Sequence, residues 1–237
     1  MSLSLLKANL KNLADRKRAK VSAWFFKTGK GQYGEGDIFL GITVPKMRET
    51  AKKYLDLSLR DIEKLLLSKI HEYRFVALVI LVSKFDKSDE AGKRKIFEFY
   101  VKNAKNVNNW DLVDCSAPYI VGEYLQEKQK DILYTFAQSK NLWERRIAIV
   151  STQAFIRKNK FGDTLAISEI LLGDSHDLIH KAAGWMLREV GKKNQATLEG
   201  FLKKHYQKMP RTMLRYAIER LDAKKKQFYM VKGANSL

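Results

Sequence analysis

The sequence predicts an all-α protein, an α-solenoid of stacked helical pairs with a concave basic groove. Three observations support this fold class: the 237 residues contain only three prolines, apolar residues recur with the period of a helix, and small residues recur at nearly constant spacing. The segments FVALVILV (75–82) and AAGWMLREV (182–190) show the helical period well. Alternation with period 2, which would indicate strands, is nearly absent.

The apolar patterns and their caps define the expected helices. Ser58 and Ser88 are typical N-cap residues at the start of two of them. The expected ranges are 2–26, 45–55, 58–69, 71–85, 89–103, 109–126, 128–138, 141–159, 163–172, 176–192, 195–207 and 210–222. Residues 28–41 (TGKGQYGEGDIFLG) are the exception, because their five glycines disfavour a helix and predict a Gly-rich loop.

Five small residues on these helices suggest an internal repeat. They are Ala77, Cys115, Ala148, Ala183 and Ala217, and they are separated by 38, 33, 35 and 34 residues. This spacing is typical of two-helix HEAT-like repeats and predicts about six helical pairs. An irregular helical bundle with accidental spacing is the alternative. Because no linker divides the sequence, we expect one domain over residues 1–237.

The charge balance predicts an acidic partner. Lysine and arginine total 45 against 26 acidic residues, a formal net charge of +19, which favours nucleic acid or an anionic membrane surface. The longest apolar run, residues 75–82, is far shorter than a membrane-spanning helix, and the first 20 residues lack the pattern of a secretory signal. A single cysteine suits a reducing compartment. We therefore expect a cytoplasmic protein without a membrane partner.

One helical sector carries basic residues, tryptophans and a carboxylate. Successive residues of a helix are rotated by about 100° around its axis, so the number of residues from the nearest small repeat residue gives the direction of each side chain. By this measure, eight side chains lie within a sector about 120° wide that faces away from the small residue. They are Arg146, Lys181 and Arg215 at −2, Trp110 and Trp143 at −5, Asp114 at −1, Trp185 at +2 and Arg188 at +5. Basic side chains neutralise phosphates, and tryptophan offers a flat surface to a sugar or base. The sector therefore favours DNA binding.

Each of these side chains also has an ordinary structural interpretation. An isolated arginine or lysine is usually solvated, Trp143 suits a helix core, and we expect Trp24 to pack. Trp110 and Asp114 lie four residues apart, but a helical aspartate often only pairs with a nearby basic residue.

Other chemistries find little support in the sequence. His176 and His180 lack further metal ligands, the glycine loop lacks a phosphate-binding motif, and Cys115 has no evident general base. We expect neither a metal nor another cofactor.

Five segments resemble the AlkD-like DNA alkylation repair family, in the family's order and at similar separations. They are FLGITVPKMRE (39–49), NNWDLVD (108–114), LWERRIAI (142–149), KAAGWMLREVGKKN (181–194) and MPRTMLRYAIER (209–220). The resemblance covers nearly the whole chain. It implies a HEAT-like fold and a monofunctional glycosylase that releases N3- and N7-alkylated purines from double-stranded DNA, without a cofactor and without base flipping. A monomer without an obligate protein partner, associated with the nucleoid when bound to DNA, is expected.

The resemblance also assigns roles to individual residues. Trp110, Asp114 and Trp185 match the catalytic cleft of the family, and Arg146 matches an arginine that contacts phosphate. Phe25 and Thr43 occupy the positions that the family's first helices contribute to the cleft, but both differ from the family pattern and the glycine loop lies between them. This difference from the family pattern leaves open which alkylated bases the protein is expected to remove.

Two other functions fit the same sequence. A non-catalytic HEAT-like module could bind DNA or structured RNA through the basic groove. A protein-binding scaffold is the commoner use of solenoids, and for it the aligned basic residues would be incidental.

Overall fold

The computed structural model describes residues 2–231, and most of these residues are helical. Within them, the only extended pairing is a single bridge between Ile38 and Ile70. The all-α prediction is confirmed. The chain divides into two compact units between Ser116 and Ala117, and each unit is described by itself. The single-domain interpretation stays a prediction.

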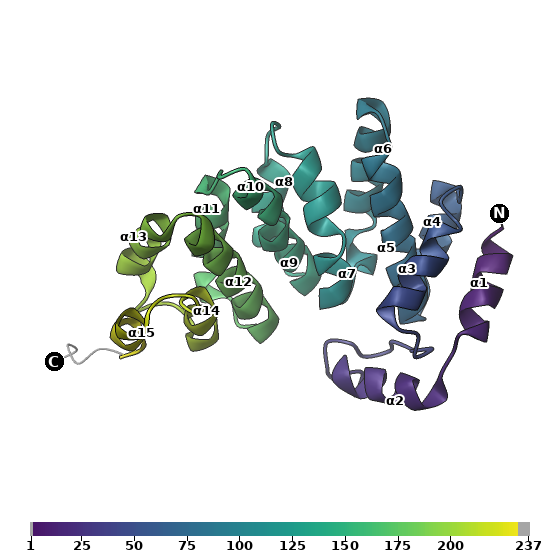
Figure 1. Cartoon of the computed structure of the whole chain (residues 1–237), viewed down its shortest axis with the longest axis horizontal. Coiled ribbons are helices and arrows are strands. Elements are labelled where there is room, and N and C mark those ends of the chain that lie inside the picture. The colour runs from purple at the N-terminus through teal and green to yellow at the C-terminus, as the bar shows by residue number, and fades with distance from the viewer. Residues whose placement is uncertain (1, 232–237) are drawn as a thin grey trace. The chain divides into compact units, whose positions relative to one another are not determined.

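The first unit is built around its longest helix (Figure 1). Its helices are α1 (Leu3–Asn12), α2 (Arg16–Phe25), α3 (Val44–Lys52), α4 (Leu59–Leu66), α5 (His71–Asp86), α6 (Glu90–Lys102), the short 3₁₀ helix η1 (Ala104–Asn106) and α7 (Trp110–Asp114). Helix α5 contacts α1, α3, α4, α6 and α7. Every residue from His71 to Leu81 is buried, because α5 is apolar on all sides after its first turn.

The helix expected over 2–26 is in fact two helices. Helix α1 ends at Asn12, and the carboxylate of Asp15 caps α2 by accepting a hydrogen bond from the amide of Arg18 at 3.0 Å. The amide of Asp15 donates to the carbonyl of Leu40 at 2.8 Å, which ties this break to the end of the glycine loop. The apolar period continues across the break, so only the cap residue signalled it.

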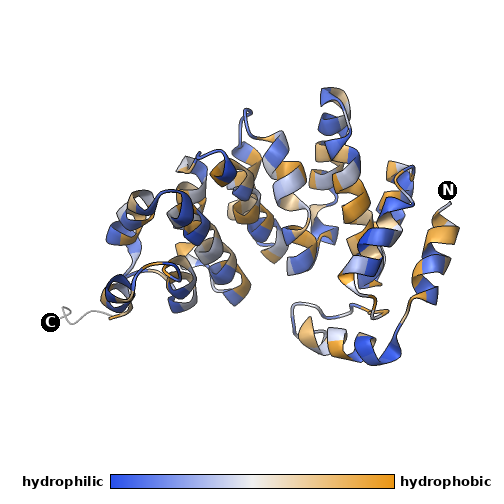
Figure 2. Cartoon of the chain, in the orientation of Figure 1, coloured by the Kyte–Doolittle hydropathy of each residue, from blue (hydrophilic) through white to orange (hydrophobic). Residues whose placement is uncertain are grey.

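Helix α2 is unusual because none of its residues is buried. The expectation that Trp24 packs is wrong: 73% of this residue is exposed. The helix is held at its two ends, by the bond from Asp15 to Leu40 and by Phe26, whose ring stacks on Phe39 with centroids 5.1 Å apart. Figure 2 shows both strongly hydrophilic and hydrophobic residues along α2.

The second unit is organised around α12. Its helices are the π-helix η2 (Pro118–Gly122), α8 (Asp131–Ala137), α9 (Leu142–Ser151), α10 (Gln153–Arg157), α11 (Gly162–Ile170), the 3₁₀ helix η3 (Leu171–Gly173), α12 (Asp177–Lys193), α13 (Gln195–His205), α14 (Arg211–Ala217) and α15 (Ala223–Met230). Helix α12 contacts α9, α13 and α14. Gly184 permits the close approach of α14, since a Cβ there would lie 2.5 Å from the carbonyl oxygen of Met213.

Several expected boundaries differ from the observed ones. The helix expected over 109–126 divides into α7 and η2, and that over 141–159 divides at Thr152. Helix α15 was not expected; the carboxylate of Asp222 caps it by accepting from the amide of Lys225 at 2.9 Å. The four alanine positions of the proposed repeat, Ala77, Ala148, Ala183 and Ala217, are fully buried, whereas Cys115 is only half-buried.

Candidate functional site

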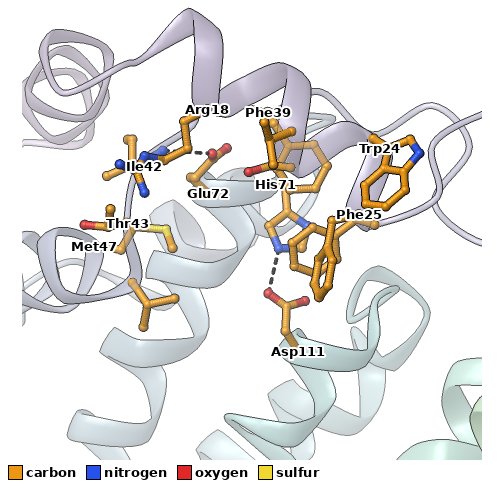
Figure 3. A pocket seen from close by; sticks show the side chains of 14 residues that line it. Arg18, Trp24, Phe25, Phe39, Ile42, Thr43, Met47, His71, Glu72 and Asp111 are labelled. Atoms are coloured by element: carbon orange, nitrogen blue, oxygen red, sulfur yellow. Dashed lines mark hydrogen bonds and ion pairs between the residues drawn. The ribbon is translucent and has the colours of Figure 1, made fainter.

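A cavity of about 380 Å³ lies beneath α2 in the first unit. Five segments line it: α2, residues 39–43, the start of α3, the start of α5, and α7 (Figure 3). Phe25, with 54% of the residue exposed, and Trp24 form the outer part, and His71 and Asp111 lie within it. The cavity therefore combines exposed aromatic rings with buried ionisable groups.

An aromatic cluster joins α2, the glycine loop and α7. The ring of Phe26 stacks on Trp110 with centroids 5.3 Å apart and an interplanar angle of 19°, and Phe25 meets Trp110 edge-on at 6.0 Å. Phe39, from the glycine loop, stacks on the His71 ring with centroids 4.6 Å apart. The cluster fixes the indole of Trp110 through rings that come from distant parts of the sequence.

A buried network of charges lies beside this cluster. His71 Nε2 is 2.8 Å from the Asp111 carboxylate, and Arg74 Nη2 donates to the Asp37 carboxylate at 2.6 Å. Asn109 Nδ2 also donates to Asp37, at 3.4 Å. His71 and Arg74 are almost wholly buried, so each charge depends on its partner in a site with little water.

The network shifts the pKa of two of its members. Burial alone would lower the pKa of His71, but the negative charge of Asp111 and hydrogen bonds to Asp111 and Asp37 raise it to about 8. Burial would raise the pKa of Asp37, but the hydrogen bond to His71 and the charge of Arg74 lower it below its usual value. At neutral pH, the His71 ring is therefore mainly protonated and Asp37 is ionised.

Glu72 anchors the end of the glycine loop. Its carboxylate accepts hydrogen bonds from the amides of Leu40, Gly41 and Ile42 at 2.9, 2.7 and 3.3 Å. Gly41 has a φ of +81°, and a Cβ there would lie 2.2 Å from the carbonyl oxygen of Asp15, so only glycine fits. The loop therefore has a structural role: it brings Asp37 and Phe39 into the site and holds the start of α2.

Four residues proposed from the sequence lie in this unit. Trp110 and Asp114 are the first and last residues of α7, whose first amide is capped by Asn109 Oδ1 at 2.8 Å. Both are half-buried. Phe25 and Thr43 line the cavity, and Thr43 is also the N-cap residue of α3. The structure brings Phe25 into contact with Trp110, whereas the roles of all four residues stay predictions.

The second unit carries the remaining candidates. Trp185, Lys181 and Arg188 lie on α12; Trp143 and Arg146 lie on α9; Arg215 lies on α14. Arg215 is exposed and Lys181 pairs with Asp177 at 2.8 Å, while Arg188 pairs with Glu219 and, at 3.5 Å, with Glu189.

Trp143 and Arg146 are only 7% and 5% exposed, and Arg146 Nη1 donates to the carbonyl of Leu178 at 2.7 Å. Burial favours the structural interpretation of Trp143, whereas Arg146 is not the solvated arginine that the ordinary interpretation expects. A contact with DNA, as the sequence suggested, stays a prediction.

The sequence interpretation missed the buried network and the exposure of Trp24. A signal was present at the start of α5, where HEYR precedes the apolar run FVALVILV. Polar residues in the first turn of an otherwise buried helix need buried partners, and this pattern marks His71, Glu72 and Arg74. The sequence could not identify Asp37 and Asp111 as those partners. They lie 34 residues before and 40 residues after His71, and local patterns do not show contacts between residues so far apart.

Residues 2–231 show neither a candidate metal site nor a membrane-spanning helix. They contain no group of three or more histidine, cysteine or acidic side chains placed to hold a metal ion. None of their helices is both long enough and apolar enough to span a bilayer.

Comparison with known proteins identifies one family. The sequence model of the family described as DNA alkylation repair enzyme matches residues 6–221. A solved structure of a predicted DNA alkylation repair enzyme from Enterococcus faecalis is similar, with a TM-score of 0.71 and 18% identity over 89% of this chain and 97% of that one. The crystal structure of smu.31 from Streptococcus mutans has a TM-score of 0.53 and 15% identity over 93% of this chain and 99% of its own. No curated protein matches the sequence.

Proposed function

Because the chain belongs to the DNA alkylation repair enzyme family, we propose that it is a monofunctional DNA glycosylase acting on cationic N3- and N7-alkylated purines in double-stranded DNA. One observation carries this proposal. Trp110 and Asp114 share the five-residue helix α7, and Phe25 and Phe26 hold the Trp110 indole from α2 and the residue that follows it. An aromatic ring and a carboxylate on one rigid element suit recognition of a deoxyribose that becomes positively charged.

The proposed reaction breaks the bond between C1′ and the purine nitrogen. The alkylated purine already carries a positive charge, so it takes the bonding electrons and leaves as a neutral base without protonation. Asp114 stabilises the oxocarbenium-like sugar that develops and orients the water that adds to C1′, and the proton that this water loses passes to solvent. Trp110 packs on the sugar and excludes bulk water, and Trp185 of the second unit is proposed for the same role.

Positioning on the duplex is proposed to use basic side chains of the second unit. Arg215 is exposed and Lys181 and Arg188 are half-buried, and basic side chains of this kind bind phosphates and fix the register of a protein on DNA. Holding the duplex by its backbone agrees with the proposal that the base need not leave the helix before the bond breaks. We place this activity in the cytoplasm, on chromosomal DNA.

The test measures release of 7-methylguanine and 3-methyladenine from methylated duplex DNA under single-turnover conditions. We expect wild type to release both bases, and Asp114→Asn to be slower by about 10² or more, since removing one preorganised electrostatic contact to a transition state costs an enzyme about that much. Asp56→Asn is the matched control, because Asp56 is an exposed aspartate of the same unit outside the site. Equal rates for wild type and Asp114→Asn would overturn the role of Asp114.

A non-catalytic DNA-binding module is the second candidate. The helix α2 favours it independently of any catalytic residue, because α2 buries nothing and carries four basic residues beside an exposed tryptophan. Binding of duplex DNA without release of either base would assign the chain to this class. Binding that does not weaken with added salt would instead point to a protein-binding scaffold.

A further inference from the structure

The buried network beside the cavity has no part in the bond cleavage proposed above. Its members are Asp37, His71, Arg74, Asn109 and Asp111. We propose that His71 and Asp37 are positioning residues, which hold α7 where its proposed catalytic side chains face the deoxyribose. The proposal rests on the glycosylase function for the reaction that this position serves.

Helix α7 is too short to fix its own position. It has five residues, and a helix of that length gains little stability from its own hydrogen bonds. Leu112 and Val113 are buried and anchor its apolar side. Trp110 and Asp114, at its two ends, are only half-buried. Their directions therefore depend on the contacts of the polar residues around them.

The network holds α7 on both sides of its first residue. Asn109 Oδ1 accepts a hydrogen bond from the Trp110 amide at 2.8 Å, and Asn109 Nδ2 donates to the Asp37 carboxylate at 3.4 Å. One oxygen of the Asp111 carboxylate accepts from a backbone amide of α7 at 2.9 Å. The other lies 2.8 Å from His71 Nε2, as the dashed line in Figure 3 marks. The residues before and after Trp110 are thus tied to the glycine loop and to α5.

His71 also supports the Trp110 indole through Phe26. The Phe26 ring lies 4.9 Å from the His71 ring and 5.3 Å from the indole, measured between centroids. The same histidine therefore holds the backbone of α7 through a carboxylate and the side chain of its first residue through an aromatic ring.

Stability alone does not account for the network. Buried ion pairs often contribute no more to stability than apolar residues of the same size, because removing charges from water offsets their attraction. Arg74 is 1% exposed, and its Nε has no hydrogen-bond partner within residues 2–231. Charges kept at this cost beside the proposed catalytic helix are better explained by a geometric role.

A direct electrostatic role would have the opposite sign. The positive His71 and Arg74 balance the negative Asp37 and Asp111, so the network adds no net charge. The charge of His71 by itself opposes the positive charge that develops on the sugar. Removing it would speed cleavage if His71 acted through its field. Removing it slows cleavage if His71 acts by holding α7.

His71 is the member of the network that changes charge near neutral pH. The charged groups that face it, or line the cavity beside it, are Asp37 of the glycine loop, Asp111 of α7, Arg74 and Glu72 of α5, and Arg18 of α2. Burial lowers the pKa of His71, but Asp111 and Asp37 raise it to about 8 against the charge of Arg74. Carboxylates and arginines do not ordinarily titrate near that pH. Raising the pH through about 8 therefore weakens the hold on α7 at His71 alone.

The first test is a double-mutant cycle on single-turnover release of 3-methyladenine from methylated duplex, at saturating protein. The proteins are wild type, His71→Gln, Asp114→Asn and the double variant. We expect His71→Gln to slow wild type about 10-fold, since misplacing reacting groups by about 1 Å can cost up to about 10²-fold. In the Asp114→Asn background its effect should be clearly smaller, because the carboxylate to be positioned is gone.

The matched control is His205→Gln. His205 is a half-buried histidine of α13 in the second unit, and its Nε2 lies 3.9 Å from the Glu169 carboxylate. This variant should release base at the wild-type rate. Affinity for unmodified duplex should be the same in wild type and His71→Gln, because the proposed phosphate contacts lie in the second unit.

The second test repeats release by wild type and His71→Gln from about pH 6.5 to about pH 9, with circular dichroism to confirm folding at each pH. Using the same DNA for both proteins cancels any titration of the substrate. We expect the advantage of wild type to be complete at about pH 6.5 and to be lost as the pH rises through about 8. A constant ratio of the two rates would overturn the proposal, as would faster release by His71→Gln. Equal slowing by His71→Gln in both backgrounds of the cycle would also overturn it.

A third measurement separates this proposal from the proposed function. The chain has four tryptophans, so NMR can resolve their indole N–H signals, and Trp110→Phe identifies that of Trp110. We expect His71→Gln to shift this signal and His205→Gln to leave it unchanged. If wild type releases no base, the glycosylase function fails, and the Trp110 signal decides whether the network positions α7: a shift supports this, and an unchanged signal overturns it. If wild type releases base and His71→Gln does so at the same rate, the proposal is overturned while the proposed function stands.

Discussion

Raising the pH through 8 is expected to destabilise the first unit by removing a proton from His71. In the folded chain the pKa of His71 is about 8, against 6.5 for an unperturbed histidine. A raised pKa means that the folded state holds the proton more tightly, so the stabilisation is complete below about pH 6.5 and is lost as the pH rises through about 8. The difference of about 1.5 units corresponds to about 2 kcal/mol, of which about 1 kcal/mol remains at pH 7.

The assay is urea unfolding followed by circular dichroism, at fixed ionic strength and at several values between about pH 6 and about pH 9. We expect the free energy of unfolding of wild type to fall by about 2 kcal/mol more than that of His71→Gln, which can still donate a hydrogen bond to Asp111 but carries no charge. Because the chain has only four histidines, proton NMR can follow the His71 ring directly. The same pH dependence in both proteins, or a His71 pKa at or below 6.5, would refute the reasoning.

Three further predictions concern particular contacts. Arg74→Met leaves the Asp37 carboxylate buried without its closest cation, so we expect a loss of about 3–5 kcal/mol in urea unfolding, most of it recovered when Asp37→Asn is added. Gly184→Ala places a methyl group 2.5 Å from the Met213 carbonyl oxygen, so we expect thermal unfolding to show a loss of about 1–3 kcal/mol; an unchanged melting temperature would mean that α12 and α14 can separate without penalty. Lys181→Gln and Arg215→Gln should each reduce the slope of log affinity for DNA against log salt by about 1, whereas Arg94→Gln, on an exposed part of α6, should leave it unchanged.

The sequence predicted the helical fold because its signals are local. The 3.6-residue period and the rarity of proline do not depend on distant contacts, and the alanine positions fall in the core where expected. Helix boundaries were less predictable where the period continues through a break. The break between α1 and α2 depends on Asp15 being both a cap and a donor to Leu40, and the second contact spans 25 residues of chain.

The candidate site was predictable only in part. Trp110 and Asp114 could be paired because four residues separate them on one helix, and the family resemblance gave that pair a meaning. The exposure of Trp24 could not be predicted, because tryptophan usually packs and the sequence does not show that α2 has no buried residue. The role of Asp37 could not be predicted either, because it depends on the glycine-rich loop placing this residue beside His71 and Arg74.

That loop explains how a helix that buries nothing can still have a defined position. Most helices gain their stability by burying an apolar face, but α2 has no such face. Its start is fixed by residues 40–42, which Glu72 holds through three backbone amides, and its end is fixed by Phe26 between Phe39 and Trp110. Both anchors lead to the first turn of α5, through Glu72 and through the stacking of Phe39 on His71. Substitutions in that turn should therefore displace Trp24 and Phe25, although neither residue lies in it.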